Sequence, residues 1–153
     1  MVELGYNAAQ DIQPGGSAIL QNLRPCQMCP QRVVHDDMSA NFTMRGIPSR
    51  PCCGYADYKV RYSCNIAVAT GGTVGEIQAA LAANGEIIPL TIAAATPAAA
   101  GNFWHVSGEK TIRVPAGMEV TMAVRNASVS ADPTTTPAPV ITMRNLNVVI
   151  DGR

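Results

Sequence analysis

Strict alternation of apolar and polar side chains over residues 58–68 is the feature that most constrains how this chain folds. The alternating pairs run Tyr58-Lys59, Val60-Arg61, Tyr62-Ser63, Cys64-Asn65, Ile66-Ala67 and end at Val68. Because side chains two residues apart share one face of a strand, this segment predicts a β-strand with one apolar face and one mostly polar face. Alternation of this kind prevails over helical periodicity along most of the chain, so we expect an all-β protein.

Turn signals between the alternating segments predict two hairpins and a bulged last strand. Residues 76–83 and 86–94 flank Asn84-Gly85, a dipeptide that suits a type I′ hairpin turn. Pro115-Ala116-Gly117 stands between the apolar runs 111–114 and 120–125 and predicts a second hairpin. The apolar phase of residues 140–150 slips near Arg144-Asn145, which predicts a β-bulge. With shorter strands expected at 18–23 and 41–47, the total of about eight or nine strands indicates a sandwich or barrel.

Length and charge exclude several classes of protein. A chain of 153 residues fits one domain. The 11 basic and 11 acidic side chains balance, whereas a general nucleic-acid binder needs a basic surplus. No apolar stretch approaches the ~20 residues of a membrane-spanning helix, and the N-terminal residues lack the pattern of a secretory signal. We therefore expect neither a nucleic-acid nor a membrane partner.

The order of the features resembles the TNF/C1q-like jelly rolls of phage and prophage structural proteins. The resemblance covers roughly residues 40–153 and is carried by patterns of strands and turns: 58–68, Thr70-Gly71-Gly72-Thr73-Val74-Gly75, 77–81, Asn84-Gly85-Glu86, 103–106, 112–117, 120–126 and 146–151. It implies a jelly-roll β-sandwich that assembles as a compact homotrimer. Residues 41–153 would form the trimerisation domain, and residues 1–40 an extended N-terminal arm that attaches it.

The same resemblance implies a function. We expect a non-enzymatic virion structural protein, a trimeric capsid decoration protein of the cement or auxiliary-head type. Its arm would bind the major capsid protein or another virion protein, and the chain would be made in the host cytoplasm and end on the capsid surface. The alternative is a receptor-binding module of a baseplate or tail tip that recognises a cell-surface glycan. Only two histidines are present, which cannot supply the metal centre of a jelly-roll enzyme.

Four cysteines form the sharpest local pattern. Cys26, Cys29, Cys52 and Cys53 lie in irregular, proline-rich sequence, and their thiolates, or three of them with His35, could hold a tetrahedral zinc. The adjacent pair disfavours zinc, and the missing export signal disfavours disulfides. Zinc, disulfides and free thiols therefore all stay open, and we expect no other cofactor. Cys64 differs, because its place on the apolar face predicts a small buried side chain.

Phe103, Trp104 and His105 form the one aromatic cluster of a chain with only 5% aromatic residues. Such a cluster serves either as a stacking surface for a glycan or as a seal at a sandwich edge or subunit interface. The proline- and threonine-rich segment 132–139 is expected to be an exposed loop that offers a further contact surface. Charged residues make up only 14% of the chain, which predicts that an assembly covers much of its surface.

Overall fold

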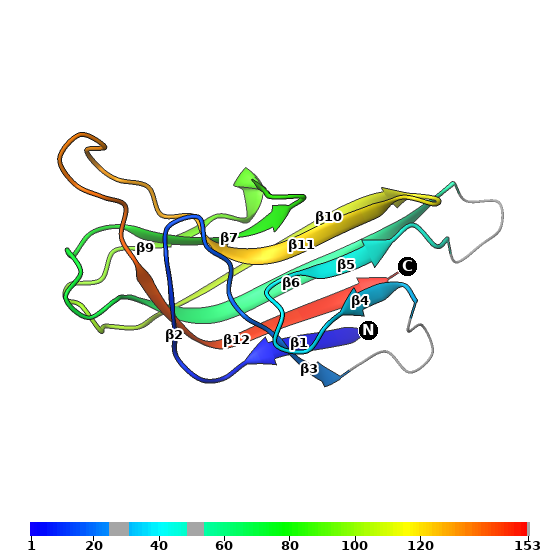
Figure 1. Cartoon of the computed structure of the whole chain (residues 1–153), viewed down its shortest axis with the longest axis horizontal. Helices are drawn as coiled ribbons and strands as arrows, with labels where there is room; N and C mark the ends of the chain where they lie inside the picture. Colours follow the sequence, from blue (N-terminus) through cyan, green and yellow to red (C-terminus); the bar gives the residue numbers. More distant parts are fainter. Residues whose placement is uncertain (25–30, 49–53, 153) are drawn as a thin grey trace.

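The computed structural model describes residues 1–24, 31–48 and 54–152, and the regular structure in this part is almost entirely β-strand. Two antiparallel sheets pack face to face as a sandwich (Figure 1). This confirms the expected all-β sandwich, while the jelly-roll family and the trimer stay predictions. No helix in the described ranges has the length and apolar character that crossing a membrane requires.

Sheet A has the strand order β10-β6-β12-β1-β3, and β2 also pairs with β12. Its strands are β1 (Val2–Tyr6), β2 (Gln10–Ile12), β3 (Gln21–Arg24), β6 (Tyr55–Val68), β10 (Trp104–Pro115) and β12 (Ile141–Gly152). The long strands β6, β10 and β12 therefore form one half of this sheet, and β10 lies at its edge.

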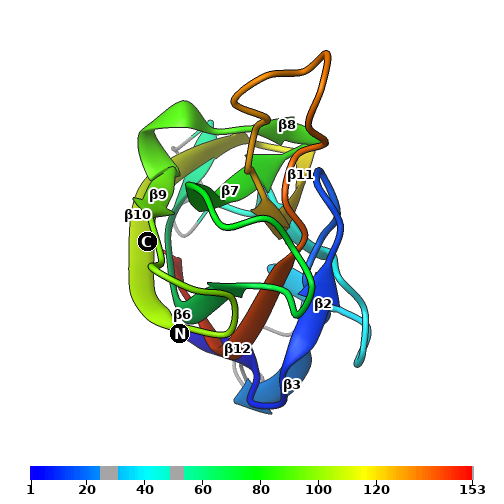
Figure 2. The same cartoon turned by 90° about the vertical axis from the view of Figure 1, so that its left-hand side faces the viewer.

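Sheet B has the order β4-β5-β11-β7-β8, and β9 also pairs with β7. Its strands are β4 (Val33–His35), β5 (Phe42–Arg45), β7 (Ile77–Ala83), β8 (Glu86–Ile87), β9 (Ala93–Ala95) and β11 (Glu119–Asn126). A short 3-10 helix, η1 (Pro89–Thr91), joins β8 to β9. Both η1 and β9 contact β10, so the two sheets approach each other along this side (Figure 2).

Strand β6 supplies the centre of the core, as its alternation predicts. Its even-numbered residues from Ala56 to Val68 are all buried, while Lys59, Arg61 and Ser63 face outward. The opposite layer of the core comes from sheet B, where Phe42, Met44, Ile77, Leu81, Met122 and Val124 are fully buried. Burial of this apolar surface at about 25 cal/mol per Å² is the main force holding the sheets together.

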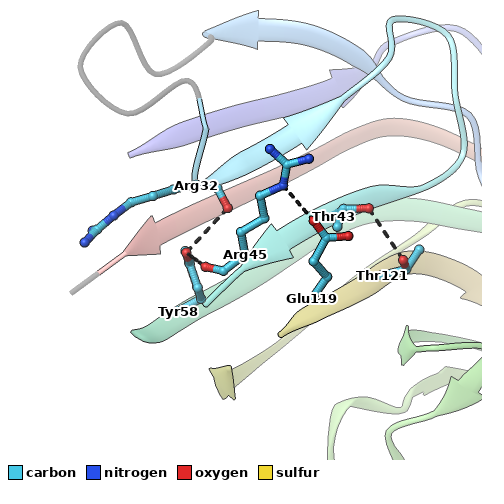
Figure 3. Close-up of polar contacts among 6 residues, drawn as sticks. All are labelled: Arg32, Thr43, Arg45, Tyr58, Glu119 and Thr121. Carbon is cyan, nitrogen blue, oxygen red and sulfur yellow. Dashed lines mark hydrogen bonds and ion pairs between the residues drawn. The ribbon is translucent and has the colours of Figure 1, made fainter. Parts of the chain in front are cut away.

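Two buried tyrosines of β6 also connect the sheets by hydrogen bonds. The Tyr58 hydroxyl donates to the backbone carbonyl of Arg45 at the end of β5, and it reaches the carbonyl of Arg32 at 3.4 Å (Figure 3). The Tyr62 hydroxyl lies 2.8 Å from the carbonyl oxygens of both Ala79 and Thr91. Each phenol thus places its polar atom on a carbonyl of the facing layer, which avoids an unpaired buried group.

Side-chain pairs between β5 and β11 support sheet B at its outer face. The Arg45 guanidinium binds the Glu119 carboxylate at 2.8 Å, and the hydroxyls of Thr43 and Thr121 lie 3.5 Å apart (Figure 3). These residues are register partners in the antiparallel ladder. Cross-strand pairs of this kind favour one register over its neighbours.

The first predicted hairpin is confirmed over β7 and β8. Asn84 and Gly85 have φ values of 49° and 88°, as a type I′ turn requires. The second strand is much shorter than expected, because Pro89 lacks an amide proton and begins η1. The chain resumes pairing with β7 only at β9, where Ala93 lies opposite Ala79.

The second predicted hairpin is wrong. Strand β10 pairs with β6 in sheet A, and β11 pairs with β5 and β7 in sheet B. Residues 115–117 do form a tight turn, with the Met118 amide on the Pro115 carbonyl at 3.0 Å, but this turn carries the chain from one sheet to the other. A Pro-x-Gly turn reverses the chain direction in either case, so it does not determine which strands pair.

The expected bulge in the last strand is confirmed. The pairing of β12 with β6 shifts register between Arg144 and Asn147, and Asn145 has a φ of 51°. An extra residue at this point moves Leu146, Val148 and Ile150 onto the buried face.

Residues 1–40 differ from the extended arm that we expected. Within the described ranges, β1 pairs with both β12 and β3, with Val2 opposite Ile150, and β4 adds to sheet B. Leu4, Ile12 and Leu20 are buried in the core. The alternation of apolar side chains is too short here to predict strands from the sequence, but β1 and β2 are stabilised by pairing with the long strand β12.

We predict that Gly46→Ala destabilises the fold, because an added Cβ would lie 1.8 Å from the Pro115 carbonyl oxygen at the corner between the sheets. The free energy of unfolding should fall by about 1–3 kcal/mol, the usual cost of overpacking. Chemical denaturation measures the change. Gly54→Ala is the matched control, because its Cβ meets no atom of the described residues within 4 Å and should change stability by less than about 0.5 kcal/mol. Equal stability of the two variants would contradict this packing.

Candidate functional site

The aromatic cluster at the start of β10 does not form one surface. Trp104 pairs with Ile66 and His105 with Asn65, so the two side chains point to opposite faces of sheet A. On the outer face the His105 Nδ1 lies 3.3 Å from Asn65 Oδ1. Phe103 carries the Arg144 guanidinium 3.7 Å above its ring. A single stacking platform made of all three predicted residues is therefore absent.

Exposed apolar side chains stand on β9, η1 and β10, which contact one another on one side of the sandwich (Figure 2 shows this side of the backbone). We call this set of residues the lateral strip and define it as Leu90, Ile92, Ala94 and Trp104. Leu90 is 78% exposed, Trp104 53% and Ile92 40%, although all three are large apolar side chains. Exposed apolar side chains on neighbouring elements are candidates for an interaction site.

Buried Thr91 fixes the backbone that presents the lateral strip. Its carbonyl accepts the Tyr62 hydroxyl, while its Oγ1 accepts the Leu81 amide at 2.9 Å and donates to the Ile88 carbonyl at 2.8 Å. Burial raises the pKa of the Tyr62 phenol, which therefore stays a hydrogen-bond donor at physiological pH. A Cβ at Gly108 would meet Thr91 O at 2.7 Å and the Tyr62 ring at 2.6 Å, so only glycine fits there.

The outer face of sheet A is polar, and its charges pair within the chain. The ion pairs are Asp57–Arg113, Lys59–Glu109 and Arg61–Asp151, with N–O distances of 2.9, 3.0 and 2.9 Å. The bidentate Arg113 fork lowers the pKa of the Asp57 carboxyl and stacks on the Tyr55 ring at 3.7 Å. These six side chains therefore pair as three ion pairs with no net charge among them.

A shallow depression of about 520 Å³ interrupts this polar face between Ser63, Ser107 and Asn147. Asn147 Nδ2 reaches the Glu3 carboxylate at 3.3 Å. Its Oδ1 is buried and has no hydrogen-bond partner in the described part of the chain. A buried acceptor left without a donor costs about 1–3 kcal/mol, so a donor from water, a ligand or another subunit is expected there.

A second hollow lies between loops 69–76 and 129–140, which are found at the left end of the sandwich in Figure 1. The cleft measures about 830 Å³ and is enclosed by loops 69–76 and 129–140. The roots of the two loops are tied together, because the Ala69 amide donates to the Val140 carbonyl at 3.1 Å. Fully buried Asn126 adds bonds from its Nδ2 to the carbonyls of Ile12 and Pro139, at 3.0 and 2.9 Å. The cleft is thus built into the fold.

The cysteine cluster that we considered for zinc or disulfides lies outside the described residues. Cys26, Cys29, Cys52 and Cys53 all fall there, so zinc, disulfides and free thiols stay open. In the ranges that the structure describes, no three His, Cys, Asp or Glu side chains gather as a metal site. His35 instead bonds to Asn22 Oδ1 at 3.0 Å and to the Ser39 carbonyl at 3.1 Å.

Cys64 is buried with a free thiol, as its place on the apolar face predicts. Burial raises its pKa to about 12, so the reactive thiolate is scarce at neutral pH.

We predict that iodoacetamide leaves Cys64 unmodified in the native protein at mildly alkaline pH and alkylates it after denaturation. Peptide mapping by mass spectrometry separates this residue from the other four cysteines. Native alkylation of Cys64 at the rate of a free thiol would show that the core around β6 is open.

Comparison with known proteins gives no family. No family model matches the sequence, and no curated protein does. Among solved structures, one similar chain is described as "EclA C-terminal domain; sugar-binding protein". The two share 16% identity over 94% of this chain and 78% of that one, with a TM-score of 0.43. Similarity at this level supports no assignment of function.

Sequence reasoning missed Leu90 and Ile92, although Leu90 is the most exposed of the three large side chains of the lateral strip. A strand expected over residues 86–94 hid them, although Pro89 was a signal that the strand ends there. Trp104 was identified as a candidate from the sequence. Because successive residues of a strand face opposite sides, the sequence also implied that His105 could not share a surface with it.

Proposed function

We propose that this chain is a non-enzymatic structural protein that assembles through the lateral strip as a homotrimer on a virion surface. The observation that carries the assembly is the exposure of Leu90, Ile92 and Trp104 on elements that contact one another, next to the edge strand β10. Tryptophan is a residue that subunit interfaces typically bury as an anchor, and the two aliphatic side chains add apolar area. Their burial removes apolar surface from water at a gain of about 25 cal/mol per Å².

The mode of contact follows from the edge strand. β10 is twelve residues long and, among the strands that the structure describes, pairs with β6 alone, so its other edge could template a further strand. Lys110 lies opposite Val60 in the register and thus belongs to the inward-facing positions of this edge. An inward charge at an edge disfavours strand addition. Side-chain packing on the strip is therefore the favoured contact.

The polar face of sheet A supports the same proposal. Its three ion pairs form inside the subunit, so a neighbour can cover them without isolating an ion. This feature suits a surface that is covered in an assembly.

The placement on a virion is supported by the sequence resemblance to phage structural proteins alone. Because residues 1–24 and 31–40 take part in the sandwich, attachment through a free arm is no longer part of the proposal. Contact with the major capsid protein or another virion protein would come from the outer surface of the sandwich.

We predict that Leu90→Asp converts the trimer to monomer, because a carboxylate in the strip would be buried at the interface. Size-exclusion chromatography with light scattering should give the mass of three chains for the wild type and one chain for the variant. Leu90 is 78% exposed, so the variant should fold normally. Met118→Asp, at an exposed apolar side chain in the turn between β10 and β11, is the matched control and should stay trimeric. A monomeric wild type, or a trimeric Leu90→Asp variant, would contradict the proposal.

The virion placement has its own test. Electron microscopy of particles made with and without this protein should show density for it on the capsid surface. Density for the protein on the tail, or the absence of the protein from particles, would contradict capsid decoration. Neither result tests assembly through the lateral strip, which light scattering measures.

A further inference from the structure

The cleft between loops 69–76 and 129–140 (the end cleft) has no role in assembly through the lateral strip. We propose that it binds a neutral oligosaccharide. Its volume of about 830 Å³ falls within the range of roughly 300–1,000 Å³ for ligand pockets. The hydrogen bonds of Asn126 and Ala69 hold its walls in place before any ligand arrives, which lowers the entropic cost of binding.

The charge of the lining restricts the class of ligand. Asp11 and Glu76 are the charged residues of the lining in the described part of the chain, and both are acidic. With no lysine, arginine or histidine among these lining residues, the cleft offers no partner for a phosphate, sulfate or carboxylate group. Anionic ligands, including nucleic acids and sialylated or sulfated glycans, are therefore disfavoured.

The polar atoms of the lining favour a ligand rich in hydroxyl groups. Asp11 accepts the Thr142 hydroxyl and Glu76 accepts the Gln78 amide, each at 2.6 Å and each through one carboxylate oxygen. No hydrogen bond in the described ranges reaches the second oxygen of either carboxylate. A hydroxyl donor satisfies such an acceptor, and a charged hydrogen bond is stronger than a neutral one.

The remaining lining is small and apolar. Val74 and Val129 are 45% and 66% exposed, and Pro137 and Pro139 lie on the same wall as Val129. Sugar rings present carbon-bound hydrogens on one face and hydroxyls at their rim, so this mixture of surfaces fits them. A fully apolar ligand would make no hydrogen bond to the carboxylates, and an anionic one would meet no counter-charge among these lining residues.

Gly75 allows the end cleft to be filled without disturbing the fold. A Cβ at this position meets no atom of the described residues within 4 Å, and its φ lies outside the left-handed region that favours glycine. Gly75→Leu should therefore fold like the wild type and narrow the cleft. Gly54→Leu is the matched control, because Gly54 is equally open among the described residues and does not line the cleft. Val129→Asp removes apolar surface on the opposite loop against which a sugar ring would pack.

The test is a glycan array with neutral, sialylated and sulfated arms, probed with the full chain and the three variants. We expect capture on neutral glycans alone, at least a tenfold loss for Gly75→Leu and Val129→Asp, and none for Gly54→Leu. Thermal unfolding checks that each variant is folded. Capture by acidic glycans, no capture at all, or capture that Gly75→Leu leaves unchanged would each overturn the inference. None of these outcomes bears on the trimer, which light scattering measures separately.

Discussion

The contact of Tyr62 with Thr91 is the interaction on which the arrangement of this molecule most depends. Tyr62 stands in the middle of β6 in sheet A, and Thr91 ends η1 on the side of sheet B. The phenol reaches the Thr91 and Ala79 carbonyls at 2.8 Å, and Gly108 leaves the space that the ring needs. Replacement of Tyr62 by phenylalanine would remove the hydroxyl that donates to these two carbonyls. An unsatisfied buried group lowers the free energy of unfolding by about 1–3 kcal/mol. One buried side chain thereby sets the spacing of the sheets and the position of η1.

This constraint connects the core to the proposed function. Thr91 is held inside, while its neighbours Leu90 and Ile92 are exposed on either side of it. The lateral strip is thus a consequence of how the sandwich closes, and its exposure in a single chain is a cost that association removes. The end cleft is independent of this side, since Asn126 and the Ala69–Val140 bond organise it at the far end of the long strands. One fold can therefore support assembly on its side and recognition at its end.

Local features were readable in the sequence, and long-range ones were not. The alternation of β6, the positive φ of Asn84 and Gly85, and the bulge at Asn145 all arise from neighbouring residues. The split of β10 and β11 between two sheets depends on partners far along the chain, such as Gly46 against Pro115. The pairing of Val2 with Ile150 is equally remote, which is why the first residues were expected to be an arm. Of the candidate surfaces, Trp104 was identified from its residue type, whereas the end cleft arises only when two distant loops meet.

The chain has a single tryptophan, which makes the central claim directly measurable. Trp104 is 53% exposed in one chain and belongs to the strip that assembly is proposed to bury. The decisive measurement is the quenching of its fluorescence by iodide across a dilution series, with the assembly state followed by light scattering. The account predicts that Trp104 is protected from iodide in the assembled protein and becomes accessible as dilution releases single chains. Equal quenching of assembled and dissociated protein would show that the lateral strip is not the interface.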